Sequence, residues 1–142
     1  MARLLLDTNI IVFLLSNDDD ALSRDVRAIM EDYDNEFLLS MESVKELLVA
    51  YRTKNLLTRI YKTPTQMIDS IQKDYGIRIL QVDMEVMRTM SKLTINEAQE
   101  HFDPSDHVII SHAITLKLPL ISSDRKFLFY QAQGLDLIYN ER

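Results

Sequence analysis

The chain opens with an apolar run that ends directly in a carboxylate. Residues 4–6 are leucines, and Asp7 follows them at once. A strand that is apolar on both faces is typical of the centre of a parallel sheet, which helices cover on both sides. Ligand sites in such sheets lie at the carboxyl ends of the strands, where the carboxylate of Asp7 needs water, a hydrogen bond or a cation. Asp7 is therefore a candidate metal-binding or catalytic acid. Asp is also a good helix N-cap, and this segment alone leaves both interpretations open.

Apolar runs and helical patterns alternate along the rest of the chain, which is typical of an α/β fold. We expect strands at Arg3–Leu6, Glu36–Leu39, Arg78–Leu80, Pro119–Ile121 and Leu135–Ile138. We expect helices at Ile10–Leu15, Leu22–Tyr33, Met41–Thr53, Thr65–Tyr75, Met84–Leu93 and Pro104–Lys117. The length of 142 residues suits a single domain spanning residues 1–142. No stretch is long enough to cross a bilayer, so we expect no membrane partner and a cytoplasmic protein.

Composition excludes several kinds of site. The chain has no Cys, which rules out disulfides and thiolate metal sites, and its two glycines cannot form a Gly-rich phosphate loop. The net charge of −6 argues weakly against a general nucleic-acid binder, but not against a nuclease with a cluster of acids. The segment from Leu47 to Ile68 has no acidic residue, and its bases include Arg52 and Lys54. This segment predicts either contacts to RNA or a partner, or a solvated helix face.

A second candidate acid lies at the start of the helix expected at 104–117. Pro104 suits the first helical position, with Asp103 as its N-cap. Asp106 could close a capping box, but it shares helical spacing with Ile109, Ile110 and Ala113. That spacing places Asp106 on the buried stripe, where an acid needs a partner. We therefore favour a functional role for Asp106.

Two further acids complete the set of candidates. Asp124 follows the short strand at 119–121, as Asp7 follows the first strand, although an Asp in a surface turn would look the same. Glu46 lies on the helix expected at 41–53, roughly opposite its apolar stripe, so periodicity alone predicts a solvated side chain. Glu42, one turn earlier on the same side, competes with Glu46 for any role.

Clustered carboxylates without cysteines suit a hard cation such as Mg²⁺ or Mn²⁺, and phosphodiester hydrolysis is one chemistry that uses them. His101, His107 and His112 surround Asp106 but lack a clear zinc spacing. We expect these histidines to be solvated or packed against helices.

An ordered set of short motifs then points to a family. It comprises Leu-Leu-Asp-Thr-Asn at 5–9, Leu22-Ser23, Leu39-Ser40 with Glu46-Leu47, Lys54-Asn55-Leu56, His101-x-Asp103-Pro104-x-Asp106, and Pro-Leu-Ile-Ser-Ser-Asp-Arg-Lys-Phe at 119–127. The set resembles the PIN-domain ribonucleases, specifically the VapC-type toxins of bacterial toxin–antitoxin pairs. The resemblance covers nearly the whole chain.

The resemblance implies a three-layer α/β/α sandwich with a mostly parallel sheet of about five strands. It implies an endoribonuclease that cuts RNA with Mg²⁺ or Mn²⁺, that a cognate antitoxin protein neutralises and that forms a homodimer. The matching catalytic and metal-binding acids are Asp7, Glu46, Asp106 and Asp124. Groups that would support these acids or contact phosphate are Thr8, Asn9, Asp103 and Ser123.

One departure and two rival functions remain. The family often has Arg where this chain has His107, which affects the expected substrate preference. One rival is a catalytically silent PIN-like module that binds a partner or RNA. The other is a signalling receiver domain, but those normally carry adjacent acids after the first strand and a late Lys. Here Thr8 follows Asp7, and Arg125 follows Asp124.

Overall fold

The computed structural model describes residues 1–53 and 56–141. Its described strands form one five-stranded sheet, and every pair of neighbours runs parallel. The strands are β1 (Arg3–Leu6), β2 (Glu36–Ser40), β3 (Arg78–Leu80), β4 (Leu120–Ser122) and β5 (Leu137–Tyr139). The α/β prediction is thus confirmed, with a fully rather than mostly parallel sheet. Each strand lies within two residues of its expected position.

The expected helices are all present, with shifted ends. The helical segments are α1 (Thr8–Leu15), η1 (Asp19–Ala21), α2 (Arg24–Glu31), α3 (Met41–Tyr51), α4 (Leu56–Ile60), α5 (Pro64–Lys73), α6 (Met84–Ser91), α7 (Pro104–Leu116) and η2 (Arg125–Gln133). The second helix begins two residues later than predicted because the Ser23 hydroxyl caps it, accepting from the Val26 amide. The segments η1, α4 and η2 were not predicted, since none of them carries a long apolar period.

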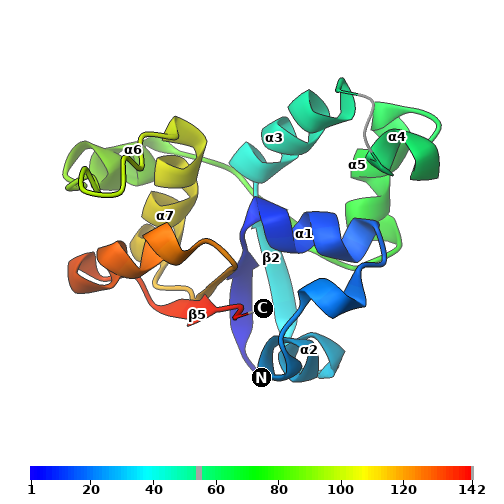
Figure 1. The fold of residues 1–142 in the computed structure, drawn as a ribbon, viewed down its shortest axis with the longest axis horizontal. Helices are drawn as coiled ribbons and strands as arrows, with labels where there is room; N and C mark the ends of the chain where they lie inside the picture. The colour runs from blue at the N-terminus through cyan, green and yellow to red at the C-terminus, as the bar shows by residue number, and fades with distance from the viewer. Residues whose placement is uncertain (54–55, 142) are drawn as a thin grey trace.

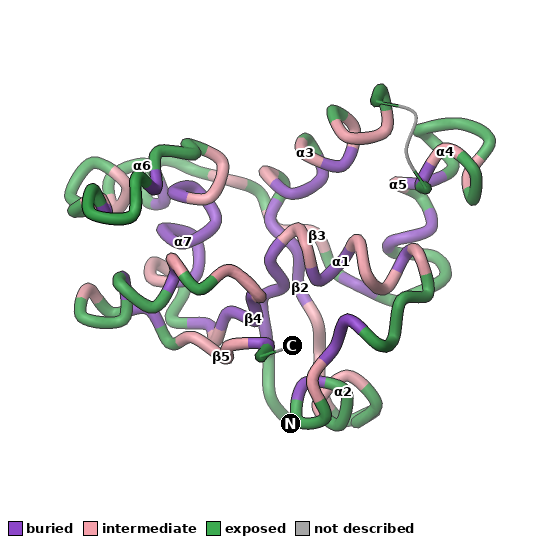
Figure 2. Tube along the Cα trace, viewed as in Figure 1, coloured by how far each residue is buried: buried purple, intermediate pink, exposed green. Residues whose placement is uncertain are grey.

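Alternating strand side chains divide the core into two layers, one on each face of the sheet. Leu4 and Leu6 pack with buried residues of α1, α2, α3, α4 and α5. Leu5 points the opposite way and packs with buried residues of α7 and η2. In Figure 1 the two groups of helices lie on opposite sides of the central strands, and Figure 2 shows the buried residues lining both faces. The three-layer prediction is confirmed.

The strand order reverses beside β1. The order is β3-β2-β1-β4-β5, so the chain builds outward from β1 on one side and then returns to build outward on the other. In open parallel sheets, ligands bind outside the carboxyl ends of the strands at such a reversal. The Leu5 and Asp7 amides donate to carbonyl oxygens of Pro119 and Ile121 at 2.8 and 2.9 Å. The carboxyl ends of β1 and β4 therefore lie side by side at this reversal.

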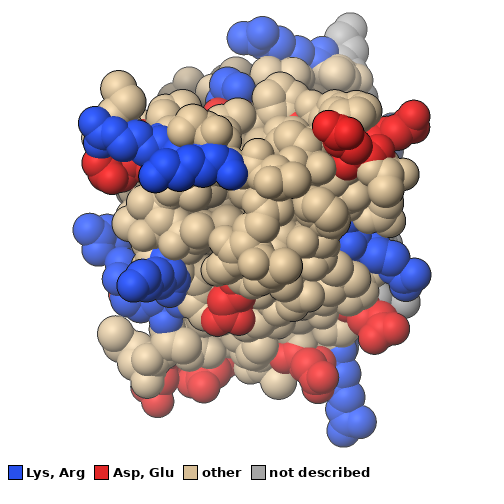
Figure 3. Space-filling model, turned by 90° about the vertical axis from the view of Figure 1, so that its left-hand side faces the viewer, with Lys and Arg blue, Asp and Glu red and all other residues tan. Residues whose placement is uncertain are grey.

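The face that carries α6, α7 and η2 is shown in Figure 3. Its charged side chains are scattered, with much of the centre uncharged. The described residues form no continuous basic surface on this face of the kind that a general nucleic-acid binder presents. No helix formed by the described residues combines the length and the apolarity that a membrane span needs.

Candidate active site

Asp7 is a buried acid at the end of β1, and it also caps α1. Its Oδ1 accepts from the Thr8 amide at 2.7 Å, and its Oδ2 accepts from the Ser122 hydroxyl at 2.7 Å. Burial raises the pKa of Asp7 from 3.8 to about 7; the two hydrogen bonds oppose this, and the charges of Asp106 and Glu46 add to it. Asp7 can therefore be both a helix cap and an acid of the site, because Oδ1 caps α1 while the carboxyl group as a whole lies near Asp106 and Glu46.

Glu46 reaches the same place from α3, which packs against both α1 and α7. The Thr8 hydroxyl lies 2.6 Å from Glu46 Oε1, to which it donates, and 2.9 Å from Ser43 Oγ. Burial raises the pKa of Glu46, as does the nearby charge of Asp103, while the Thr8 hydrogen bond lowers it. The solvated position expected from periodicity is wrong, because neighbouring helices flank that side of α3.

Glu42, the competing residue, is bound to other partners. Its Oε2 accepts from the Ser105 hydroxyl at 2.7 Å and pairs with Lys45 Nζ at 2.5 Å. Glu42 therefore links α3 to the start of α7, whereas Glu46 faces Thr8 and the other acids.

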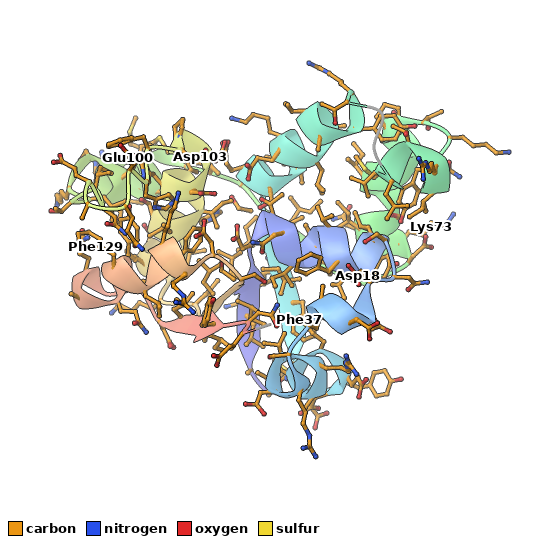
Figure 4. All side chains as sticks on the ribbon, in the orientation of Figure 1. Asp18, Phe37, Lys73, Glu100, Asp103 and Phe129 are labelled. Atoms are coloured by element: carbon orange, nitrogen blue, oxygen red, sulfur yellow. The ribbon has the colours of Figure 1, made fainter. Side chains whose placement is uncertain are left out.

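Asp103 and Asp106 come from the first turn of α7. Asp103 is its N-cap, as predicted, and accepts from the Ser105 amide at 2.9 Å. Figure 4 shows Asp103 at the beginning of α7, towards α3. Asp106 is 17% exposed, and its Oδ2 lies 2.8 Å from His101 Nε2. Burial raises the pKa of Asp106 to about 7, with the charges of Asp103, Glu46 and Asp124 adding to the effect. The inward-facing acid expected at this position has its partner in His101.

Asp124 follows β4 and caps η2, where its Oδ1 accepts from the Lys126 amide at 2.9 Å. Its own amide donates to Ser122 Oγ at 3.0 Å, while the Ser122 hydroxyl donates to Asp7. Ser122 thus connects the acids at the ends of two neighbouring strands. Sequence reasoning missed Ser122, although the pairing of Leu6 with Ile121 makes Ser122 the residue beside Asp7 once the strand order is known.

The acids form two overlapping groups that share Asp106. One ligand atom each from Glu46, Asp103 and Asp106 lie within 4.8 Å of one another, and so do those of His101, Asp106 and Asp124. Asp7 belongs to neither group, but the charges of Asp106 and Glu46 act on it. Oxygen donors dominate both groups, which suits Mg²⁺ or Mn²⁺. A cation here would relieve the mutual repulsion that disfavours ionised carboxylates.

The remaining predicted residues take different places. Asn9 Oδ1 is buried and has no hydrogen-bond partner among the described residues. Ser123 Oγ accepts from Asn140 Nδ2 at 2.7 Å, an interaction that ties β4 to the end of β5. Arg52 is exposed at the end of α3, and Lys54 lies outside the described residues.

All three histidines are buried. The expectation that they are solvated is therefore wrong, and the expectation that they pack inside the protein is confirmed. His107 Nε2 lies 2.8 Å from the carbonyl oxygen of His101, and His112 Nδ1 lies 2.9 Å from Ser40 Oγ. His107, which replaces the family's common Arg, therefore faces the backbone inside the protein. His101 was not recognised in the sequence as a site residue, although its place five residues before Asp106 is part of the quoted motif.

Comparison with known proteins places this geometry in a family. Solved structures with the same fold include VapBC2 from Rickettsia felis bound to a DNA fragment from their promoter, at a TM-score of 0.72 and 17% identity, covering 98% of this chain and 99% of that chain. VapBC-1 from nontypeable Haemophilus influenzae aligns with a TM-score of 0.70 and 19% sequence identity. The alignment covers 96% of this chain and 97% of that chain. VapBC-5 from Mycobacterium tuberculosis aligns with a TM-score of 0.61 and 17% sequence identity, covering 100% of both chains. VapBC-5 is a member of the VapBC family of toxin–antitoxin systems. The comparison with curated proteins gives no match. The PIN domain model matches residues 4–133, and the chain therefore belongs to the PIN domain family.

Proposed function

We propose that this protein is a metal-dependent endoribonuclease, the toxin of a VapC-type toxin–antitoxin pair. The observation that carries the proposal is the convergence of acids from α3 and α7 with those at the carboxyl ends of β1 and β4. Burial and neighbouring charges raise the pKa values of Asp7 and Asp106 to about 7 there. Perturbed acids gathered in a cleft are typical of functional sites. The likeness in fold to VapBC structures supports the toxin assignment.

We assign Asp7, Glu46 and Asp106 to the principal cation, and Asp124 to the same cation or a second one. A bound Mg²⁺ or Mn²⁺ would supply charge neutralisation at the scissile phosphate and a water of lowered pKa. The residues of the chain hold the acids ready for this. The Ser122 hydroxyl orients Asp7 Oδ2, and the Thr8 hydroxyl orients Glu46 Oε1. The expected products carry 3′-hydroxyl and 5′-phosphate ends.

We further propose a cognate antitoxin that covers this site. A groove beside the acids is lined by Lys45, Glu46, Val49, Ala50, Thr53 and Ser105. A basic side chain of the antitoxin inserted there would compensate the buried carboxylates as a cation does. One solved structure of similar fold is a toxin–antitoxin complex from Klebsiella pneumoniae, which supports a partner protein of this kind. We also propose a homodimer, with Arg52 and Lys54 as contacts to RNA or a partner, and a cytoplasmic location.

Cleavage of a mixed pool of structured RNA tests the enzyme. Protein purified free of antitoxin is incubated with Mg²⁺, Mn²⁺ or EDTA, beside Asp7→Asn and the control Asp69→Asn. Asp69 is an exposed acid on α5, so its variant loses the same charge away from the site. We expect cutting by wild type and the control with either metal, and none with EDTA or by Asp7→Asn. Cutting by Asp7→Asn with metal present would refute the assigned site.

The same experiment separates the enzyme from a catalytically silent module. A silent module would leave the pool intact in every metal and would still bind RNA or a partner. The ends of the fragments, mapped by sequencing, identify the bond that is cut.

A further inference from the structure

We propose that His101 is a positioning residue for Asp106, holding its Oδ2 so that Oδ1 is the oxygen offered to the cation. This inference rests on the proposed function, since it concerns the same acids. His101 lies in the loop between α6 and α7 and is only 2% exposed. Its Nε2 is 2.8 Å from Asp106 Oδ2, and its Nδ1 is 2.9 Å from the Tyr130 hydroxyl oxygen. The imidazole therefore bridges an acid of the site and the phenol of η2.

The hydrogen bonds around Tyr130 suit one tautomer of His101, in which Nε2 carries the ring proton. The Asn96 amide donates to the Tyr130 hydroxyl oxygen at 3.2 Å. If the Tyr130 O–H in turn donates to His101 Nδ1, then Nε2 carries the ring proton and donates to Asp106 Oδ2. Each donor then has an acceptor, with a neutral imidazole and the ionised carboxylate that a bound cation favours. This tautomer, assigned from the network, makes His101 a donor to Asp106.

The surroundings of His101 leave its ring little freedom. The ring lies against the rings of Phe127 and Tyr130, each at a centroid distance of 5.5 Å, and against His107 at 5.2 Å. His107 Nε2 also lies 2.8 Å from the His101 carbonyl oxygen, and the His101 amide donates to the Asn96 carbonyl at 3.0 Å. The backbone and the ring of His101 are thus both held from α7 and η2. Such support matches what a positioning residue needs.

The other acids of the site show the same arrangement. Ser122 donates to one oxygen of Asp7, and Thr8 donates to one oxygen of Glu46. His101 does this for Asp106, the acid common to both groups of potential ligands. Donors that orient metal-binding carboxylates commonly contribute to metal affinity through that orientation. Each of the three acids assigned to the principal cation, Asp7, Glu46 and Asp106, is therefore hydrogen-bonded to a side chain from another element.

Direct metal binding by His101 is the competing role, because one of its ring nitrogens lies within 4.8 Å of oxygens of Asp106 and Asp124. A metal ligand needs a nitrogen lone pair that points at the ion. In the tautomer assigned above, Nε2 donates to Asp106 and Nδ1 accepts from the Tyr130 hydroxyl. Neither nitrogen then has a free lone pair to offer a cation, and this tautomer favours the positioning role.

Two amide substitutions test the role. In His101→Gln the amide nitrogen reaches roughly as far as Nε2 and can donate to Asp106. In His101→Asn the side chain is shorter, so its amide group can reach only the position of Nδ1 and not Asp106. Both remove the imidazole, so a loss of packing alone affects them alike. Mn²⁺ affinity is measured by electron paramagnetic resonance titration, beside RNA cleavage and thermal unfolding. We expect His101→Asn to lower Mn²⁺ affinity about 10- to 100-fold and His101→Gln to retain most of it.

His112→Asn is the matched control. His112 is a second buried histidine of the same region, on α7, and it pairs with Ser40 rather than with an acid. Its variant should lower the unfolding temperature without changing Mn²⁺ affinity. If His101→Asn does not fold, Tyr130→Phe tests the same chain of hydrogen bonds, because it keeps the ring and removes the hydroxyl. It should lower Mn²⁺ affinity, and unchanged affinity would overturn the proposal.

Three results would overturn the positioning role. The first is an equal loss of Mn²⁺ affinity in His101→Asn and His101→Gln, and the second is no loss in either variant. The third is a coupling between an imidazole nitrogen and bound Mn²⁺ in pulsed electron paramagnetic resonance spectra, which would make His101 a ligand. A wild-type protein that neither binds Mn²⁺ nor cuts RNA would instead refute the proposed function. Wild-type binding and cutting, together with an unaffected His101→Asn variant, would refute the positioning role alone.

Discussion

Replacing Asp7 with Asn should stabilise the metal-free protein, and increasingly so as the pH rises. Asp7 is 3% exposed, and its pKa is raised from 3.8 to about 7, chiefly by burial. The folded state therefore holds the Asp7 proton more tightly than the unfolded state does. The contribution of Asp7 to the free energy of unfolding is therefore largest below about pH 4. This contribution falls as the pH rises towards about 7 and stays low above that. At about 1.4 kcal/mol per pKa unit, the total loss of unfolding free energy is on the order of 4 kcal/mol.

The assay is urea unfolding in EDTA at about pH 5 and about pH 8, comparing wild type with Asp7→Asn. Because Asn cannot ionise, the stability advantage of the variant should grow by about 2.5 kcal/mol between these two pH values. The variant keeps an oxygen for the Thr8 amide, and its new amide group can donate to Ser122 Oγ. Its folded state therefore needs little rearrangement. Added Mn²⁺ should narrow this gap, stabilising wild type by about 2.7 kcal/mol at one hundred times its dissociation constant.

Asp69→Asn serves as the control, since Asp69 is exposed on α5. Its difference from wild type should stay constant between the two pH values. A gap between Asp7→Asn and wild type that also stays constant would refute the reasoning. It would mean that Asp7 ionises in the folded protein as readily as in the unfolded chain.

Two further substitutions test how the fold is held together. Asn140 is fully buried; it accepts from the Ser23 amide at 2.6 Å and donates to the Ala21 carbonyl at 2.8 Å. Asn140→Ala should cost about 2–4 kcal/mol of unfolding free energy because it leaves buried polar groups unpaired, and a loss well below this range in urea titration would contradict that accounting. Gly134 has a φ of +103°, and an added Cβ would lie 3.7 Å from Ile114 Cγ2, an ordinary contact. Gly134→Ala should therefore cost about 1 kcal/mol or more through the backbone alone, and an unchanged or higher melting temperature would contradict this.

The local patterns of the chain were sufficient for much of the fold. Strands β1 and β3 were predicted to the residue, and Asp103 was recognised as the cap of α7. The spacing of Asp106 with Ile109 and Ile110 correctly placed this acid on an inward face, where it meets His101. These features depend on hydrogen bonds and side-chain periodicity within one or two turns, which the sequence displays directly.

Other parts of the candidate site could not be predicted in this way. Periodicity put Glu46 on the solvent side of its helix, because it reports only where the main apolar stripe lies. The contact with Thr8 arises because a second helix covers that side. Ser122 and His101 were missed because each is defined by a partner on another element. No local pattern distinguishes a serine that meets a buried acid from one that meets water.

The sequence by itself determined that β1 is a buried central strand ending in an acid, because its leucines need cover on both faces. Only the tertiary structure decided that β4 pairs with β1, and this brings Asp7 beside Ser122, 115 residues later in the chain. The physical reason is range. Strand and helix preferences act over a few residues, whereas strand order depends on how whole layers pack. The acids became a site only when that packing brought together the ends of β1 and β4, the middle of α3 and the beginning of α7.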